Sequence, residues 1–243
     1  MTPPNKTVST TQKDLLVVDS IVKVFGAFRA LDGVDLTLAP GEVLGLVGPN
    51  GSGKTTLINV ISGLLKPTSG QVDFEHATVS GHSSYRIARR GINRTFQIPK
   101  PFGTLTVQEN LQVAIRSGTD VSIEDTLELV GLVGVQQRLA ATLTAADQKR
   151  LDLARALATN PRLLLVDELG AGLSVSELDD LAAVLRRLVQ ERGISLLVVE
   201  HLLGFLGKVT DRVVVLNAGQ VIFSGSLADA ISDDEVVRVF IGG

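Results

Sequence analysis

The segment GPNGSGKT, residues 48–55, constrains this chain more than any other feature of its sequence. It follows EVLGLVG (42–48), a short and nearly continuous apolar run that is typical of a buried parallel strand. It precedes TTLINVISGLL, which has helical character. A glycine-rich loop at the N-terminus of a helix directs backbone N–H groups toward an anion, so the segment predicts a phosphate-binding loop. The alternative is an ordinary glycine-rich turn, which the flanking strand and helix disfavour.

Each residue type in this loop has a chemical reason to be there. Glycines let the backbone approach phosphate oxygens, Lys54 reaches the β- and γ-phosphates, and the Thr55 hydroxyl is a ligand for Mg²⁺. The residues expected to contact the nucleotide in this loop are Gly48, Pro49, Asn50, Gly51, Ser52, Gly53, Lys54, Thr55 and Thr56.

Two acidic residues end a second apolar strand, RLLLVDE (162–168). Asp167 is a hard oxygen ligand suited to the hydration shell of Mg²⁺. Glu168 is placed to polarise an attacking water. Acidic residues at strand ends are otherwise helix caps or solvated turn residues, and the phosphate-binding loop makes that interpretation the weaker one.

The order of elements predicts a parallel sheet. A further apolar strand is expected at 194–201, after a helix that starts at the capping box of Ser174 and Glu177 and ends at Gly193. This strand–helix–strand alternation is a βαβ signature with a right-handed crossover.

Other segments predict antiparallel pairing and a helical insert. Residues 15–25 and 34–38 are expected to pair, with the turn-like LDG (31–33) between them. Residues 71–75 are expected to join this pair, and 212–225 to form a hairpin before a short terminal helix. The stretch from about 98 to 159 has helical spacing and is expected to be an inserted helical subdomain.

Composition excludes several classes of protein. The chain of 243 residues has no cysteine, so disulfides, thiol catalysis and cysteine-ligated metals are excluded. Its net charge of −3 argues against a broad nucleic-acid surface. Glu200 and His201 interrupt the most apolar stretch, so no apolar run is long enough to span a bilayer. Residues 1–13 resemble a disordered tail rather than a secretory signal.

From about Leu15 to its C-terminus, the chain closely resembles the ATP-binding subunits of ABC transporters. The resemblance rests on Walker A (48–56), Walker B (163–167, followed by Glu168), the glutamine of RTFQ at Gln97 and the switch histidine at His201. The stretch RRGINRTFQIPKPFGTLTVQENLQVA and the ending VVRVFIGG are most similar to the branched-chain amino-acid uptake group.

The resemblance implies an α/β fold: a P-loop NTPase (RecA-like) core with an antiparallel β subdomain and an inserted α-helical subdomain, in one ABC ATPase domain over 14–243. It also implies that Gln97 contacts Mg²⁺ or the water and that His201 hydrogen-bonds the γ-phosphate. Phe25 matches the aromatic residue on which the family stacks adenine, with core packing as the rival interpretation and Phe28 close by.

The chain departs from the family pattern in its signature motif and at two later positions: Leu169 stands where the family has proline, and Ser174 where it usually has aspartate. The signature departs most. Where the family carries LSGGQ, which covers the γ-phosphate held by a second subunit, this chain has LTAAD at 143–147. Thr144 keeps the hydroxyl, while Ala145 and Ala146 each add a methyl group where glycine is usual. The Asp147 carboxylate either repels the phosphates or turns back to cap its helix, and the sequence leaves both orientations open.

These features predict an ATP-binding and hydrolysing subunit of an ABC importer for branched-chain amino acids or similar small solutes. Its cofactors are ATP and Mg²⁺, and its place is cytoplasmic, peripheral on the inner face of the cell membrane. The implied partners are a second ABC ATPase subunit, either a copy or a relative, transmembrane permease subunits and, indirectly, an extracytoplasmic solute-binding protein; no nucleic acid is expected.

Two other functions are alternatives. A non-transport ABC-type clamp or regulatory subunit would make ATP binding the main event and would not associate with a membrane protein. A P-loop kinase is disfavoured because the glutamine loop, the helical insert and the switch histidine have no role in it.

Overall fold

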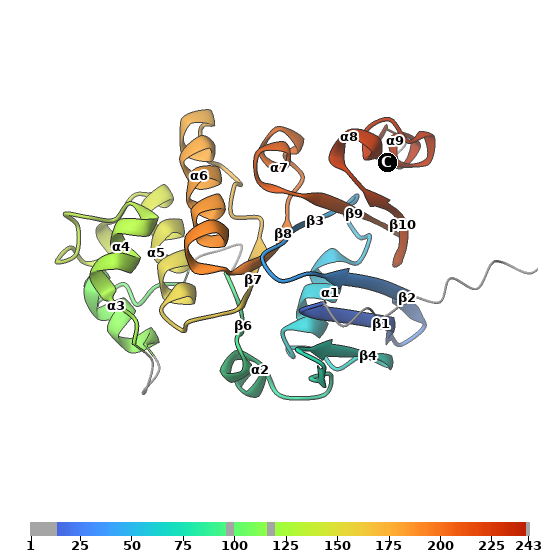
Figure 1. Ribbon diagram of the computed structural model, residues 1–243, viewed down its shortest axis with the longest axis horizontal. Coiled ribbons are helices and arrows are strands. Elements are labelled where there is room, and N and C mark those ends of the chain that lie inside the picture. Colours follow the sequence, from blue (N-terminus) through green and yellow to red (C-terminus); the bar gives the residue numbers. More distant parts are fainter. Residues whose placement is uncertain (1–13, 96–99, 116–119, 242–243) are drawn as a thin grey trace, which may run out of the picture.

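The computed structural model describes residues 14–95, 100–115 and 120–241 (Figure 1). The predicted tail at 1–13 and Gln97 lie outside the described residues.

A mostly parallel sheet forms the centre of the fold. Its strand order is β10-β9-β3-β8-β7-β6, with parallel pairing from β9 to β6 and an antiparallel edge strand, β10. The strands are β3 (Val43–Val47), β6 (Ile92–Arg94), β7 (Leu163–Asp167), β8 (Ser195–Val199), β9 (Arg212–Asn217) and β10 (Gln220–Gly225). Every residue of β3, β7 and β8 is buried, as their continuous apolar sequences predict.

A second, antiparallel sheet packs beside the first (Figure 1). Its strand order is β2-β1-β4-β5. The strands are β1 (Leu16–Phe25), β2 (Phe28–Leu38), β4 (Ser69–Phe74) and β5 (Ala77–Thr78). The predicted pairing of 15–25 with 34–38 and the addition of 71–75 are confirmed, as is the hairpin of β9 and β10. The predicted turn at LDG (31–33) is wrong: these residues continue β2, and the chain turns at 26–27.

Helices cover the sheets (Figure 1). Helix α1 follows β3, α3 to α5 lie at the end of the molecule beyond β6, and α8 and α9 lie near the C-terminus. The helices are α1 (Lys54–Ile61), α2 (Ser84–Arg90), α3 (Val107–Ala114), α4 (Ile123–Val130), a 3₁₀ turn (Ala140–Thr142), α5 (Ala145–Leu157), α6 (Val175–Arg192), α7 (Leu203–Val209), α8 (Leu227–Ala230) and α9 (Asp234–Ile241).

Local sequence explains where α6 begins and ends. The Ser174 hydroxyl accepts a hydrogen bond from the Glu177 backbone N–H, and the Glu177 carboxylate accepts one from the Ser174 N–H at 2.7 Å. Gly193 ends the helix at φ +62°, a conformation that glycine adopts easily. The predicted capping box and C-cap are therefore confirmed.

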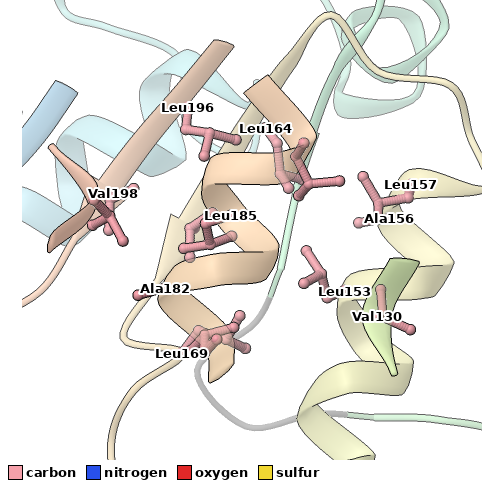
Figure 2. Close-up of a cluster of buried hydrophobic side chains, with 14 of the residues drawn as sticks. Val130, Leu153, Ala156, Leu157, Leu164, Leu169, Ala182, Leu185, Leu196 and Val198 are labelled. Atoms are coloured by element: carbon pink, nitrogen blue, oxygen red, sulfur yellow. The ribbon is translucent and has the colours of Figure 1, made fainter. Parts of the chain in front are cut away.

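One large apolar core joins the central sheet to the helical end of the molecule. Figure 2 shows Leu185 of α6 between the side chains of β7 and β8 on one side and those of α5 on the other. Leu164, Leu185 and Leu196 are fully buried in this core. The three helices between β6 and β7 thus share a core with the sheet, although the boundaries 98–159 of a separate subdomain remain a prediction.

The sequence does not predict the short elements β6, α2 and α7. Strand β6 has three residues, and α2 and α7 have seven each, which is too short for a periodic pattern to stand out. Among the described residues, no helix is long and apolar enough to cross a membrane.

Truncation of the central leucine of this core tests the packing. Leu185→Ala is expected to lower the free energy of unfolding by about 2–5 kcal/mol, because it leaves a cavity between α6 and the sheet. Urea denaturation measures this change. Val175→Ala on the same helix is the control, since Val175 is 75% exposed. Equal effects of the two substitutions would contradict this description of the core.

Candidate nucleotide-binding site

The predicted site residues meet at one edge of the central sheet. Strands β3, β8 and β7 are neighbours and run parallel, so their carboxyl ends share an edge. The phosphate-binding loop leaves β3 at this edge, Asp167 is the last residue of β7, and His201 follows β8 by two residues. The shared edge explains why residues far apart in the sequence form one site.

The backbone of the phosphate-binding loop requires glycine at particular positions. Gly53 has φ +109°, and a Cβ atom there would lie 2.7 Å from the backbone oxygen of Ala30. Gly48 has φ +150°, and a Cβ atom there would lie 2.1 Å from the Leu216 oxygen. The loop is therefore packed tightly against β2 and β9 and accepts only glycine at these positions.

Lys54 is held inside the loop. It is 8% exposed, and its Nζ donates hydrogen bonds to the backbone oxygens of Gly48 at 2.7 Å and Pro49 at 2.9 Å. Burial lowers the pKa of the Lys54 ammonium, and the nearby carboxylates of Glu168 and Asp167 oppose that shift. The ammonium can exchange these carbonyl partners for phosphate oxygens.

A cavity of about 220 Å³ opens next to the loop. Its lining includes Asn50, Gly51, Gly53, Lys54, Thr55 and Thr56 of the loop, together with Glu168, Ala30 and Phe28. The cavity therefore places cationic, hydroxyl and N–H groups opposite a carboxylate. Such a combination suits a polyphosphate and its counterion.

Phe28 and Phe25 are neighbours across the β1–β2 hairpin. Both are exposed aromatic residues, and Phe28 lines the cavity, whereas Phe25 lies beneath the Lys23 ammonium at 5.0 Å. The assignment of adenine stacking to Phe25 remains a prediction, and the structure adds Phe28 as a candidate.

Asp167 is buried beside the loop and is paired with a cation. Its Oδ2 accepts a hydrogen bond from Arg94 Nη2 at 3.0 Å, and its backbone N–H donates to Thr95 Oγ1 at 3.3 Å. Burial raises the pKa of the Asp167 carboxyl, and the Arg94 guanidinium opposes that shift.

The donor set at this edge fits a hard cation in the presence of phosphate. The Thr55 hydroxyl and the Asp167 carboxylate provide oxygen ligands, which Mg²⁺ prefers. The described residues contain no cluster of three histidine, aspartate or glutamate side chains that would bind a metal by themselves.

Glu168 has an unusual backbone conformation. Its φ is +46°, while its N–H donates to the Val199 oxygen at 2.9 Å. A non-glycine residue in this region costs on the order of 1–3 kcal/mol, and such residues concentrate at functional sites. The strained turn directs the chain away from β7 immediately after Asp167, with Glu168 lining the cavity.

Of the remaining residues predicted for this edge, the structure describes His201 but not Gln97. Gln97 lies outside the described residues. His201 is exposed beyond β8, and Glu200 before it is buried, with its Oε1 accepting a hydrogen bond from the Gly170 N–H at 2.6 Å. Glu200 thereby holds the segment that follows Glu168.

The altered signature begins a regular helix. Thr144 is the N-cap of α5, and its Oγ1 accepts a hydrogen bond from the Asp147 N–H at 3.1 Å. Ala145 and Ala146 are helical, so replacement of glycine causes no backbone strain at either position. Lys149 Nζ donates to the Leu169 oxygen at 2.8 Å, which connects α5 to the segment after Glu168.

Sequence reasoning missed Arg94, Phe28 as a cavity residue, and Lys149. The signal for Phe28 in the sequence is a second aromatic residue three positions after Phe25. Arg94 ends a strand too short to recognise, and Lys149 contacts carbonyl oxygens that carry no side-chain pattern.

The fold and the site together define a class of protein. A glycine-rich phosphate loop after β3, an Asp–Glu pair at the end of a neighbouring parallel strand, and a helical segment between β6 and β7 define an ATP-binding cassette ATPase.

Comparison with known proteins identifies the family. A family model described as "ABC transporter" matches residues 31–171, and the chain belongs to this family. It is 32% identical to the high-affinity branched-chain amino acid transport ATP-binding protein BraF of Pseudomonas aeruginosa, over 95% of this chain and 98% of that protein. It is 34% identical to the probable branched-chain amino acid transport ATP-binding protein LivG of Methanocaldococcus jannaschii, over 94% of this chain and 98% of that protein.

Solved structures of ATP-binding cassettes have the same fold. A nucleotide-free cassette from an ABC transporter matches with a TM-score of 0.87 at 34% identity, covering 95% of this chain and 100% of that one. A cassette in its ADP conformation matches with a TM-score of 0.85 at 33% identity, covering 95% of this chain and 99% of that one. A dimeric cassette in a post-hydrolysis state, bound to ADP and Pi, matches with a TM-score of 0.77 at 26% identity, covering 87% of this chain and 98% of that one. The α/β fold with a P-loop core is confirmed, and the chain is a nucleotide-binding subunit of its family.

The tight packing around the loop gives a direct test of the site. Gly53→Ala is expected to weaken nucleotide binding roughly tenfold or more, because the added Cβ atom would lie 2.7 Å from the Ala30 oxygen. Titration with a fluorescent ATP analogue measures the affinity. Gly204→Ala is the control, since a Cβ atom there meets nothing within 4 Å. Unchanged affinity in Gly53→Ala would contradict the assignment of this loop.

Proposed function

We propose that the chain is the ATP-binding and hydrolysing subunit of an ABC importer for branched-chain amino acids or similar small solutes. The observation that carries the proposal is the cavity in which Lys54, Thr55 and Glu168 face one another beside Asp167. The names of the relatives support the substrate class, because BraF and LivG are branched-chain amino acid transport proteins.

The cofactors of this proposal are ATP and Mg²⁺. Thr55 and Asp167 would hold Mg²⁺, together with Gln97, which lies outside the described residues. When bound, the ion supplies positive charge that neutralises the phosphate oxygens. Lys54 contributes a second positive charge from within the loop.

The residues of the chain have separate roles in hydrolysis. Glu168 orients the attacking water and accepts its proton, which suits a carboxylate lining the cavity. Lys54 exchanges its carbonyl partners for the β- and γ-phosphates, and His201 hydrogen-bonds the γ-phosphate. Transition-state charge is therefore stabilised by groups that the fold already holds in place.

A second ATPase subunit, a copy or a relative, would complete the site. Thr144 and Ala145 at the N-terminus of α5 are exposed and therefore accessible to the nucleotide of a partner. The helix N-terminus favours a phosphate, while Asp147 in its first turn disfavours one. The site formed by the signature of this chain is proposed to be slower than a site formed by a glycine-containing signature.

A surface groove supports contact with a permease. Leu64 and Tyr85 border a groove of about 300 Å³ between the end of α1 and α2, and they are 51% and 68% exposed. Exposed apolar side chains around a groove mark interaction surfaces. Through this contact the subunit would lie on the inner face of the cell membrane, with an extracytoplasmic solute-binding protein supplying the solute to the permease.

Replacement of the proposed base tests the chemistry. Glu168→Gln is expected to lower kcat for ATP hydrolysis at least about 100-fold while leaving ATP binding intact, because the amide accepts no proton. Phosphate release is measured at several protein concentrations. Glu124→Gln, an exposed residue of α4, is the control. Hydrolysis by Glu168→Gln at the wild-type rate would rule out this role.

Co-purification tests the transport role against the clamp. A transport subunit is expected to co-purify with a polytopic membrane protein after detergent extraction, and Tyr85→Glu is expected to reduce the amount recovered. Val133→Glu is the matched control, because Val133 is 64% exposed in the helical segment outside the groove. Full ATPase activity with no membrane partner would favour a non-transport clamp or regulatory subunit.

A further inference from the structure

Arg94 occupies a junction between three parts of the nucleotide site. It is the last residue of β6, which pairs in parallel with β7, and it precedes Gln97 by three positions. Its Nη2 donates to Asp167 Oδ2 at 3.0 Å, and its Nη1 donates to Asn59 Oδ1 at 2.7 Å. Asn59 lies on α1, the helix that begins at Lys54 of the phosphate-binding loop.

The burial of this ion pair makes its geometry energetically important. The side chains of Arg94 and Asp167 are 11% and 8% exposed. Two charges at this depth are stable only when they are paired and hydrogen-bonded. Burial lowers the pKa of Arg94 and raises that of Asp167, and each partner opposes the shift of the other.

The contacts of Arg94 restrict how Asp167 can turn. One carboxylate oxygen, Oδ2, is held by the guanidinium, and the backbone N–H of the same residue is bonded to Thr95. Because the other arm of the guanidinium is bound to Asn59, the orientation of the carboxylate is tied to α1. The planar fork of arginine supports two such contacts at once, which a lysine ammonium does less well.

We propose that Arg94 is a positioning residue for the magnesium site: it orients the Asp167 carboxylate relative to the phosphate-binding loop so that Mg²⁺ binds with ATP. This proposal rests on the proposed use of MgATP. In this role Arg94 would act through the Asp167 carboxylate and not as a ligand of the metal. Partners of a metal-binding carboxylate orient it, and their loss typically weakens metal affinity by 10–100-fold.

The experiment measures Mg²⁺ binding rather than turnover. In the Glu168→Gln background, binding of a fluorescent ATP analogue is titrated with Mg²⁺, and the concentration of Mg²⁺ that gives half of the increase is recorded. Arg94→Met is expected to raise this concentration about tenfold or more, and Arg94→Lys by less. Binding of the analogue in the presence of EDTA is expected to stay unchanged, because the loop contacts remain.

Two further variants keep the test decisive. Asn59→Ala retains the Arg94–Asp167 pair but removes its connection to α1, so a smaller rise in the required Mg²⁺ is expected even where Arg94→Met folds poorly. Arg90→Met, at the exposed end of α2, is the control and is expected to match the parent.

The outcomes separate this proposal from the function on which it rests. If binding of the ATP analogue to the Glu168→Gln parent does not depend on Mg²⁺, the proposed MgATP site itself is wrong. If the parent responds to Mg²⁺ and the Arg94 and Asn59 variants respond identically, the pair is only structural and the positioning role is wrong. A lower Mg²⁺ requirement in Arg94→Met would show that Arg94 competes with the metal, which also contradicts the proposal.

Discussion

The parallel pairing of β3, β8 and β7 is the constraint on which the site depends. Every residue of these strands is buried, so their register is fixed by the core on both faces. Leu46 and Asp167 both pair with Val199, which places the phosphate-binding loop and the acidic pair at one edge. A shift of any of these strands would separate the lysine, the carboxylates and the histidine.

Burial at this edge makes each charge depend on a partner. Lys54 is held by loop carbonyls, Asp167 by Arg94, and the segment after Glu168 by Lys149 and Glu200. Low local polarity strengthens these contacts and raises the cost of leaving a group unpaired. The α5 helix and the end of β8 are therefore both connected to the segment after Glu168.

The sequence predicts those features that follow an apolar pattern or a known local motif. Glycines 48 and 53, the apolar strands and the capping box of α6 each have a local physical cause, and each was predicted. The partner of Asp167 was not, because Arg94 lies 73 residues away on a three-residue strand and only the folded sheet brings the two together. The sequence points to Phe25 with Phe28 close by, but only the folded turn at 26–27 pairs the two residues and places Phe28 in the lining of the cavity.

The most direct measurement is sedimentation velocity of Glu168→Gln protein with and without MgATP. The proposed function predicts that MgATP converts the monomer into a dimer, because Thr144 at the N-terminus of α5 would contact the γ-phosphate held by a second copy and the variant would not hydrolyse it. A dimer that forms equally without nucleotide, or protein that neither binds ATP nor associates with itself or a related ATPase subunit, would contradict the central claim that ATP closes two cassettes.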